Sequence, residues 1–88
     1  MRILLTLSLF GFATAATAGP QCTKEPTTKW QPKDEVQKMA VAATGYKVDV
    51  FKVTDGNCYE LYGRDKAGKR VEIYYHPITA EVVKKSVR

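Results

Sequence analysis

The stretch that decides the fold is residues 45–75, which read GYKVDVFKVTDGNCYELYGRDKAGKRVEIYY. Apolar and polar residues alternate along three parts of this stretch, as they do in strands that bury one face of a sheet. The pattern predicts a strand that begins at Tyr46, a second strand at 58–65 and a third at 69–75. Two short turns separate these strands, so the sequence predicts an antiparallel meander.

Each turn fixes which residues of its hairpin lie opposite one another. Asp55-Gly56 is a typical two-residue hairpin turn, and it sets Val50 opposite Leu61. Lys66-Ala67-Gly68 suits a three-residue loop with a left-handed glycine, and it sets Leu61 opposite Ile73. A slip of one residue would move every side chain to the other face. The two registers together collect one apolar face, which consists of Val48, Val50, Leu61, Val71 and Ile73.

The same pairing predicts that the opposite face is rich in aromatic and acidic residues. It places Phe51, Glu60 and Tyr74 in one row, with Tyr62 and Glu72 beside them. Either the segment before the helix folds across this face and shelters it, or part of it is an open patch that binds a partner. We expect shelter near Cys58 and exposure toward Tyr62 and Tyr74.

A helix precedes the strands. Pro32 suits its first position, and acidic residues follow in the first turn, where the helix dipole favours negative charge. Gly45 can adopt the left-handed conformation that ends a helix. One apolar stripe follows helical spacing and predicts the face that packs on the sheet: Val36, Met39, Ala40 and Ala43. With a short edge strand at 81–84, the predicted fold is α+β, one N-terminal helix packed on a three- to four-stranded antiparallel β-meander.

The N-terminus has the pattern of an export signal. Arg2 is followed by an apolar run at 3–12 and by the small residues Ala16-Thr17-Ala18, which predicts a signal peptide at 1–18. Ala13-Thr14-Ala15 is a second possible cleavage site. The apolar run is too short for a helix that crosses about 30 Å of hydrocarbon. We therefore expect a periplasmic or secreted protein without a transmembrane segment after cleavage.

Two cysteines remain in the chain, Cys22 and Cys58. In an exported protein an even cysteine number predicts a disulfide. A metal site or a redox pair has no support, since there is no C-x-x-C motif and His76 is the single histidine. The ring of residues 22–58 contributes roughly 4 kcal/mol in the chain-entropy treatment. Pro20 and Pro26 predict that residues 19–31 form an extended arm.

The net charge and the reactive side chains of the chain limit the functions that the sequence allows. The chain has a formal net charge of +5, and its basic residues lie mostly in the second half. Export argues against nucleic acid, which leaves a solvated face, an anionic surface or an acidic partner. Catalysis needs a positioned nucleophile, base or metal. His76 precedes Pro77 in a predicted surface turn, so we expect no enzyme, no catalytic or metal-binding residue and no cofactor.

Several short motifs follow one another in a characteristic order. They are Gly45-Tyr46, Cys58-Tyr59-Glu60, Asp65-x-x-Gly68, Val71-Glu72-Ile73-Tyr74 and Pro77-x-Thr79-x-Glu81. In this order the chain resembles the PepSY family over about residues 30–84. The family usually has glycine where this chain has Ala80. The resemblance implies a helix on a small antiparallel sheet, residues 32–88 as the PepSY-like domain, and a role as an inhibitory or chaperone-like module.

The sequence therefore supports two functions. The first is a PepSY-like binding module that regulates or inhibits a peptidase or another envelope protein, such as a sensor. Its candidate partner-binding residues lie on the aromatic face and in the last turn: Phe51, Tyr62, Tyr74, Pro77, Thr79 and Glu81. The second is a non-enzymatic envelope protein that binds anionic polymer or lipid through its basic face. We expect a monomer or a weak dimer, because an exposed last strand can pair with a copy of itself.

Overall fold

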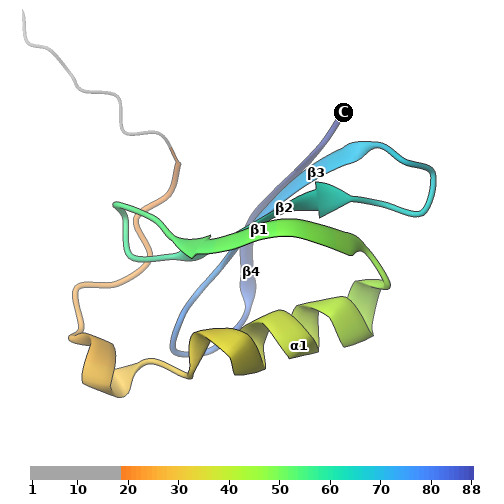
Figure 1. Ribbon diagram of the computed structural model, residues 1–88. Helices are drawn as coiled ribbons and strands as arrows, with labels where there is room; N and C mark the ends of the chain where they lie inside the picture. Colours follow the sequence, from red (N-terminus) through yellow and green to blue (C-terminus); the bar gives the residue numbers. More distant parts are fainter. Residues whose placement is uncertain (1–18) are drawn as a thin grey trace, which may run out of the picture.

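The structure is a computed structural model, and it describes residues 19–88. The predicted signal peptide at 1–18 lies outside the described residues. The elements follow one another as a 3-10 turn, a helix and a meander of strands: η1 (Thr27–Lys29), α1 (Lys33–Thr44), β1 (Lys47–Val53), β2 (Tyr59–Arg64), β3 (Arg70–Tyr75) and β4 (Val82–Val87). The sheet is antiparallel with the strand order β1-β2-β3-β4, so the predicted α+β class is confirmed (Figure 1).

Helix α1 begins after Pro32 and ends at Gly45. Gly45 has a φ of 70°, and its amide donates to the carbonyl of Val41, as expected for a left-handed glycine that ends a helix. The helix lies along the edge strand β1 (Figure 1). Only half of the predicted apolar stripe is buried, namely Val36 and Ala40. Met39 and Ala43 are exposed, because they lie on the flank of the stripe, where an edge strand offers no further sheet to cover them.

The register predicted for the first hairpin was wrong over half its length. The turn is a three-residue loop, in which the Thr54 amide donates to Cys58 and Asn57 adopts a left-handed φ of 61°. The extra loop residue moves the pairing by one, so Phe51 lies opposite Leu61 and Val50 does not. A bulge at Asp49 moves the pairing back, and Val48 lies opposite Gly63 as predicted.

The second hairpin has the predicted register. Leu61 lies opposite Ile73, and Tyr59 lies opposite Tyr75. Gly68 has a φ of 83°, which confirms the left-handed position in the three-residue loop. The last strand is longer than the predicted segment 81–84, because its pairing with β3 continues to Val87.

The core lies between α1 and the inner face, which is the sheet face toward the helix. Val36 and Ala40 pack there against residues from β2 and β3. Phe51 contributes to this core, since its ring centroid lies 5.7 Å from Tyr59 and 6.3 Å from Tyr75. The buried members of the cluster are Val36, Ala40, Tyr59, Leu61, Val71, Ile73 and Tyr75.

The arm before α1 is fastened at both ends. Near the helix, the Tyr59 hydroxyl donates to the carbonyl of Gln31 over 2.6 Å, and the Gln31 amide donates to Pro77 over 2.8 Å. At the other end a disulfide joins Cys22 to Cys58, the pairing expected from the sequence. The Cys22 amide also donates to Gly56 over 2.8 Å. The arm is therefore part of the folded unit, not a loose tail.

The first residues of the arm cover part of the outer face, which is the sheet face away from α1. A Cβ atom added to Gly19 would lie 2.9 Å from the ring and the hydroxyl of Tyr74, so this glycine packs directly on the phenol. Tyr74 is only 8% exposed. The expectation that the face is open at Tyr74 was therefore wrong, because the disulfide holds the arm over this row of the sheet.

The turn between β3 and β4 contains Ala80, at the position where the resemblance implies glycine. Ala80 has a left-handed φ of 65°, and its amide donates to the carbonyl of His76 over 2.8 Å. An L-residue with a side chain adopts this conformation at a cost of about 1–2 kcal/mol. The turn is held by this hydrogen bond, by the one that the His76 amide donates to the carbonyl of Glu81, and by Ala80 packing against the core.

Candidate functional site

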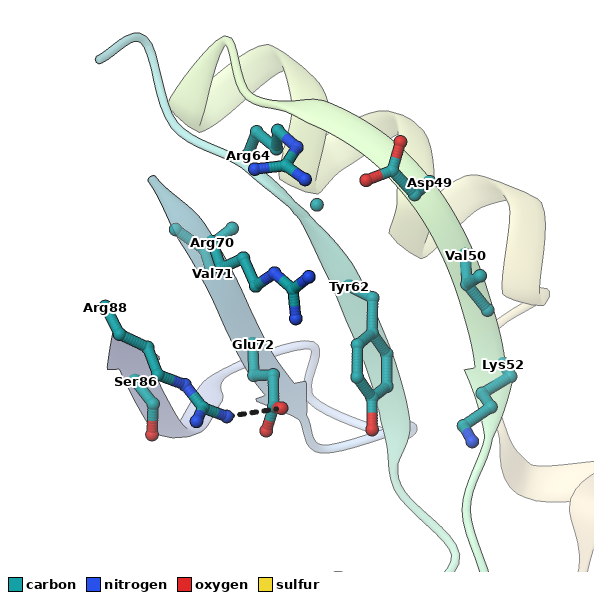
Figure 2. Close-up of a pocket in the computed structure, with 11 residues that line it drawn as sticks. Asp49, Val50, Lys52, Tyr62, Arg64, Arg70, Val71, Glu72, Ser86 and Arg88 are labelled. Carbon is teal, nitrogen blue, oxygen red and sulfur yellow. Dashed lines mark hydrogen bonds and ion pairs between the residues drawn. The ribbon is translucent and has the colours of Figure 1, made fainter. Parts of the chain in front are cut away.

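A groove of about 360 Å³ lies on the outer face, beside the part that the arm covers. Figure 2 shows its side chains, which come from all four strands and the C-terminal residue, with α1 behind the sheet. Val50 and Tyr62 form the apolar part of the groove and lie opposite each other across β1 and β2. Both are accessible, with Val50 47% and Tyr62 36% exposed. The groove therefore combines an aromatic surface with open access from solvent.

One row of cationic residues crosses the sheet at the end of this groove. Arg64 lies opposite Arg70 across β2 and β3, and Lys47 continues the row on β1. Arg88 extends it beyond β4, because its amide and carbonyl exchange hydrogen bonds with Arg70. Like charges directly opposite each other destabilise a sheet. A row of this kind has no evident benefit for the isolated fold, and it favours an anionic ligand.

Acidic groups balance only part of this charge. The Arg88 guanidinium lies 3.2 Å from the carboxylate of Glu72, as the dashed line in Figure 2 shows. The Arg64 guanidinium donates to the carbonyl of Gly68 over 3.1 Å, so its charge has no carboxylate partner among the described ion pairs. The groove lining holds four cationic side chains and two carboxylates. An excess of two positive charges therefore faces any ligand in the groove.

Tyr62 lies between groups of opposite charge. The ammonium of Lys52 lies 5.4 Å from the centroid of its ring, a cation–π distance. Partial burial, followed by the carboxylate of Glu60 and the charge of Glu72, raises the pKa of the Tyr62 hydroxyl. The hydroxyl is therefore directed to the Glu60 carboxylate, and the ring is the part of Tyr62 that is open to a ligand.

The structure does not bring together the six residues proposed from sequence. Tyr62 lies in the groove. Phe51 was placed on the outer face, which was wrong, because the shifted register turns it into the core. Tyr74 is covered by the arm and Pro77 is buried, whereas the turn residues Thr79 and Glu81 are exposed. This turn follows the far end of β3, so it does not contribute to the groove.

Sequence reasoning missed most of the groove. The candidate partner-binding residues did not include Arg64, Arg70 or Arg88, nor did they include Val50 or Lys52. A signal for the cationic row was present, because the predicted register of the second hairpin already places Arg64 opposite Arg70. The predicted last strand ended at Lys84, so the prediction did not place Arg88 beside Arg70.

His76 has a structural role in its turn. Its Nδ1 atom accepts from the amide of Ile78 over 3.2 Å and lies 3.4 Å from the amide nitrogen of Thr79. This ring nitrogen is therefore used to hold the backbone. Within residues 19–88, no three His, Cys, Asp or Glu side chains are close enough to bind a metal ion. No helix in this part of the chain is long and apolar enough to cross a membrane.

Comparison with known families agrees with this fold. The family described as "Peptidase propeptide and YPEB domain" matches residues 2–86. The chain belongs to the PepSY family. Neither the comparison with curated proteins nor that with solved structures found a match. PepSY domains are typically non-catalytic modules, and no catalytic domain is detected in this chain. The PepSY domain and the disulfide together indicate an extracytoplasmic protein.

Proposed function

We propose that this PepSY protein is an exported, non-catalytic binding module that regulates a peptidase or another envelope protein. The partner would place an acidic segment in the outer groove, against Tyr62. The observation that carries this proposal is the accessible Tyr62 in a groove beside the row of Arg64, Arg70 and Arg88. Tyr and Arg are the residues that most often anchor protein interfaces.

The chemistry of the groove defines the kind of segment. Guanidinium groups bind carboxylates through paired hydrogen bonds. Val50 and the Tyr62 ring would take an apolar or aromatic side chain from the same segment. A groove of about 360 Å³ accommodates a few side chains, not a folded domain. The segment is therefore an exposed loop or a terminus of the partner.

The module would regulate its partner by binding to it and not by catalysing a reaction. His76 holds its own turn through Nδ1, and it lies in the turn after β3, outside the groove lining. Ser86 lines the groove, but no histidine is among the residues beside it. A serine without an adjacent base is a weak nucleophile. A bound module can inhibit a peptidase by blocking a surface that its substrate needs.

The test uses the oxidised mature protein, starting at Gly19, as bait for envelope proteins of its own cell. Captured proteins are identified by mass spectrometry, and the dissociation constant is then measured with the purified partner. We expect Tyr62→Ala to raise this constant at least about tenfold, because an aromatic anchor is lost. Val41→Ala on the exposed side of α1 is the matched control and should change little. Equal affinities of both variants would contradict the proposal.

A second function is favoured by the cationic row. The protein would bind anionic polymer or lipid headgroups through Arg64, Arg70 and Arg88. Such binding depends mainly on charge and weakens steeply between low and physiological salt. It would be lost in Arg70→Gln but kept in Tyr62→Ala. Binding of a protein partner should instead depend on both residues and persist at physiological salt.

A further inference from the structure

The carboxylate of Glu60 is buried on the outer face without a full set of partners. Glu60 is 3% exposed, and its Oε2 atom has no hydrogen-bond partner within the described residues 19–88. An unpaired buried carboxylate costs several kcal/mol unless an opposite charge or hydrogen-bond donors compensate it. The site therefore points to a missing cationic group.

The neighbouring side chains do not supply this group. Lys52 lies opposite Glu60 across β1 and β2, but its ammonium is turned to the ring of Tyr62 and forms no ion pair with Glu60. The hydroxyls of Tyr62 and Tyr74 also adjoin the carboxylate, because burial, followed by a hydrogen bond to Glu60, raises the pKa of both. These phenols are neutral donors, so they do not balance the negative charge, and Oε2 keeps no partner among the described residues. Glu72 is a further carboxylate near Tyr74 and makes the site more negative.

The arm brings Gly19 to this site. The position of an added Cβ on Gly19 lies 2.9 Å from the Tyr74 hydroxyl, which places the Gly19 nitrogen within about 6 Å of that hydroxyl by standard bond lengths. The disulfide from Cys22 to Cys58 and the hydrogen bond from Cys22 to Gly56 hold the arm there. Glycine is required at this position, because a side chain would collide with the phenol and φ is 98°.

We propose that the site at Glu60 and Tyr74 binds the α-ammonium group of Gly19 after the signal peptide is removed. Hydrolysis by a signal peptidase breaks the bond between Ala18 and Gly19, and the elements of water go to the two fragments. Ala18 leaves with the new carboxylate, and the Gly19 nitrogen takes up protons to become an ammonium. This group supplies a positive charge and three donors, whereas the uncleaved amide supplies one neutral donor.

Processing would thus complete the fold. The ammonium neutralises the Glu60 carboxylate and fixes the start of the arm over Tyr74. This inference rests on the export and the cleavage after Ala18 that belong to the proposed function, but it is independent of partner binding. Loss of partner binding in Tyr62→Ala and loss of the ammonium site can therefore be distinguished.

The test compares two forms of the oxidised protein, one beginning at Gly19 and one that retains Ala18. Each form is made with Glu60 and with Glu60→Gln, and the unfolding equilibrium constant is measured in urea. We expect the extra residue to raise this constant about tenfold when Glu60 is present, as for the loss of a charge-assisted hydrogen bond. In Glu60→Gln the extra residue should change it less than about twofold. Glu35→Gln, a control at an exposed carboxylate of α1, should retain the tenfold effect.

Titration by NMR gives a second measurement that does not depend on the Glu60→Gln variant folding. The pKa of the Gly19 α-amine should lie above the ordinary range of a free α-amino group, because a nearby carboxylate favours the charged form. A normal pKa, or an equal effect of the extra residue with and without Glu60, would overturn the proposal. It would also be overturned if the intact mass of the chain purified from the envelope showed that it begins at Ala16. A further contradicting result is that Lys52→Gln destabilises the protein as much as the extra residue does, and only when Glu60 is present.

Discussion

Val50 lies opposite Tyr62 on the outer face, although Val48, two residues earlier on the same strand, lies opposite Gly63 on the inner face. Asp49 is the extra residue of a bulge between them. The bulge exchanges the roles of Val50 and Phe51, so that a valine joins the groove and an aromatic ring joins the core. The composition of the candidate site thus depends on one irregularity in an edge strand.

This exchange predicts unequal costs for two truncations on the same strand. Phe51→Ala removes a ring that contacts Tyr59 and Tyr75 in the core, so we expect a loss of about 2 kcal/mol in the free energy of unfolding. Val50→Ala removes an exposed side chain and should cost about 0.5 kcal/mol or less. Urea unfolding of both variants measures the difference. A larger cost for Val50→Ala would support the register without a bulge.

Reduction of the disulfide should strongly destabilise the protein. Cys22 and Cys58 are separated by 36 positions, and release of such a ring costs about 4 kcal/mol in the chain-entropy treatment. Reduction also frees the arm that covers Tyr74. Urea unfolding with and without reductant measures the effect. Two free thiols in protein produced in the periplasm would contradict this role of the cysteines.

Ala80→Gly should stabilise the protein. Glycine adopts the φ of 65° without the steric cost that alanine has, and the loss of a partly buried methyl group offsets some of this gain. We expect the free energy of unfolding to rise by up to about 1 kcal/mol. Ala67→Gly in the exposed hairpin loop is the matched control, and it should lower stability slightly, since Ala67 does not have a positive φ. Thermal unfolding of both variants measures these changes. A lower melting temperature for both variants would show that packing of the methyl group outweighs backbone strain at Ala80.

Tyr74 should make the fold sensitive to alkali. Burial, followed by its interaction with Glu60, raises the pKa of Tyr74 from 10.0 to about 12. The folded protein therefore holds this proton more tightly than the unfolded chain does. The associated stability, roughly 2–3 kcal/mol, is present below pH 10 and is lost as the pH rises toward about 12. Tyr74→Phe should flatten the fall in unfolding free energy over this range, and an unchanged slope would argue against a buried Tyr74.

The fold could be predicted from the sequence where the signals are local. Gly45 ends the helix, Gly68 fixes the second hairpin, and the alternation of Leu61 with Gly63 identifies the inner face of β2. The first hairpin could not be predicted in the same way. Asp55-Gly56 has the composition of a two-residue turn, but Asn57 also tolerates a left-handed conformation and lengthens the loop.

The candidate site was less accessible to sequence reasoning, because it depends on contacts between distant segments. The cover over Tyr74 comes from Gly19, and only the folded arm shows that a glycine fits there. The bulge at Asp49 placed Val50 beside Tyr62 without any composition signal in β1. The cationic row, in contrast, follows from the register of Arg64 and Arg70, so a longer prediction for β4 would have revealed it.

The most direct test of the proposed function is photo-crosslinking from position 62 in the intact cell envelope. A benzoylphenylalanine replaces Tyr62, and the same group at position 41, on the exposed side of α1, serves as the control. We predict a crosslink from position 62 to one extracytoplasmic protein, a peptidase in the first instance, that is absent from position 41 and reduced by Arg70→Gln. Equal products from both positions, or products with lipid or polymer alone, would contradict a protein-binding groove.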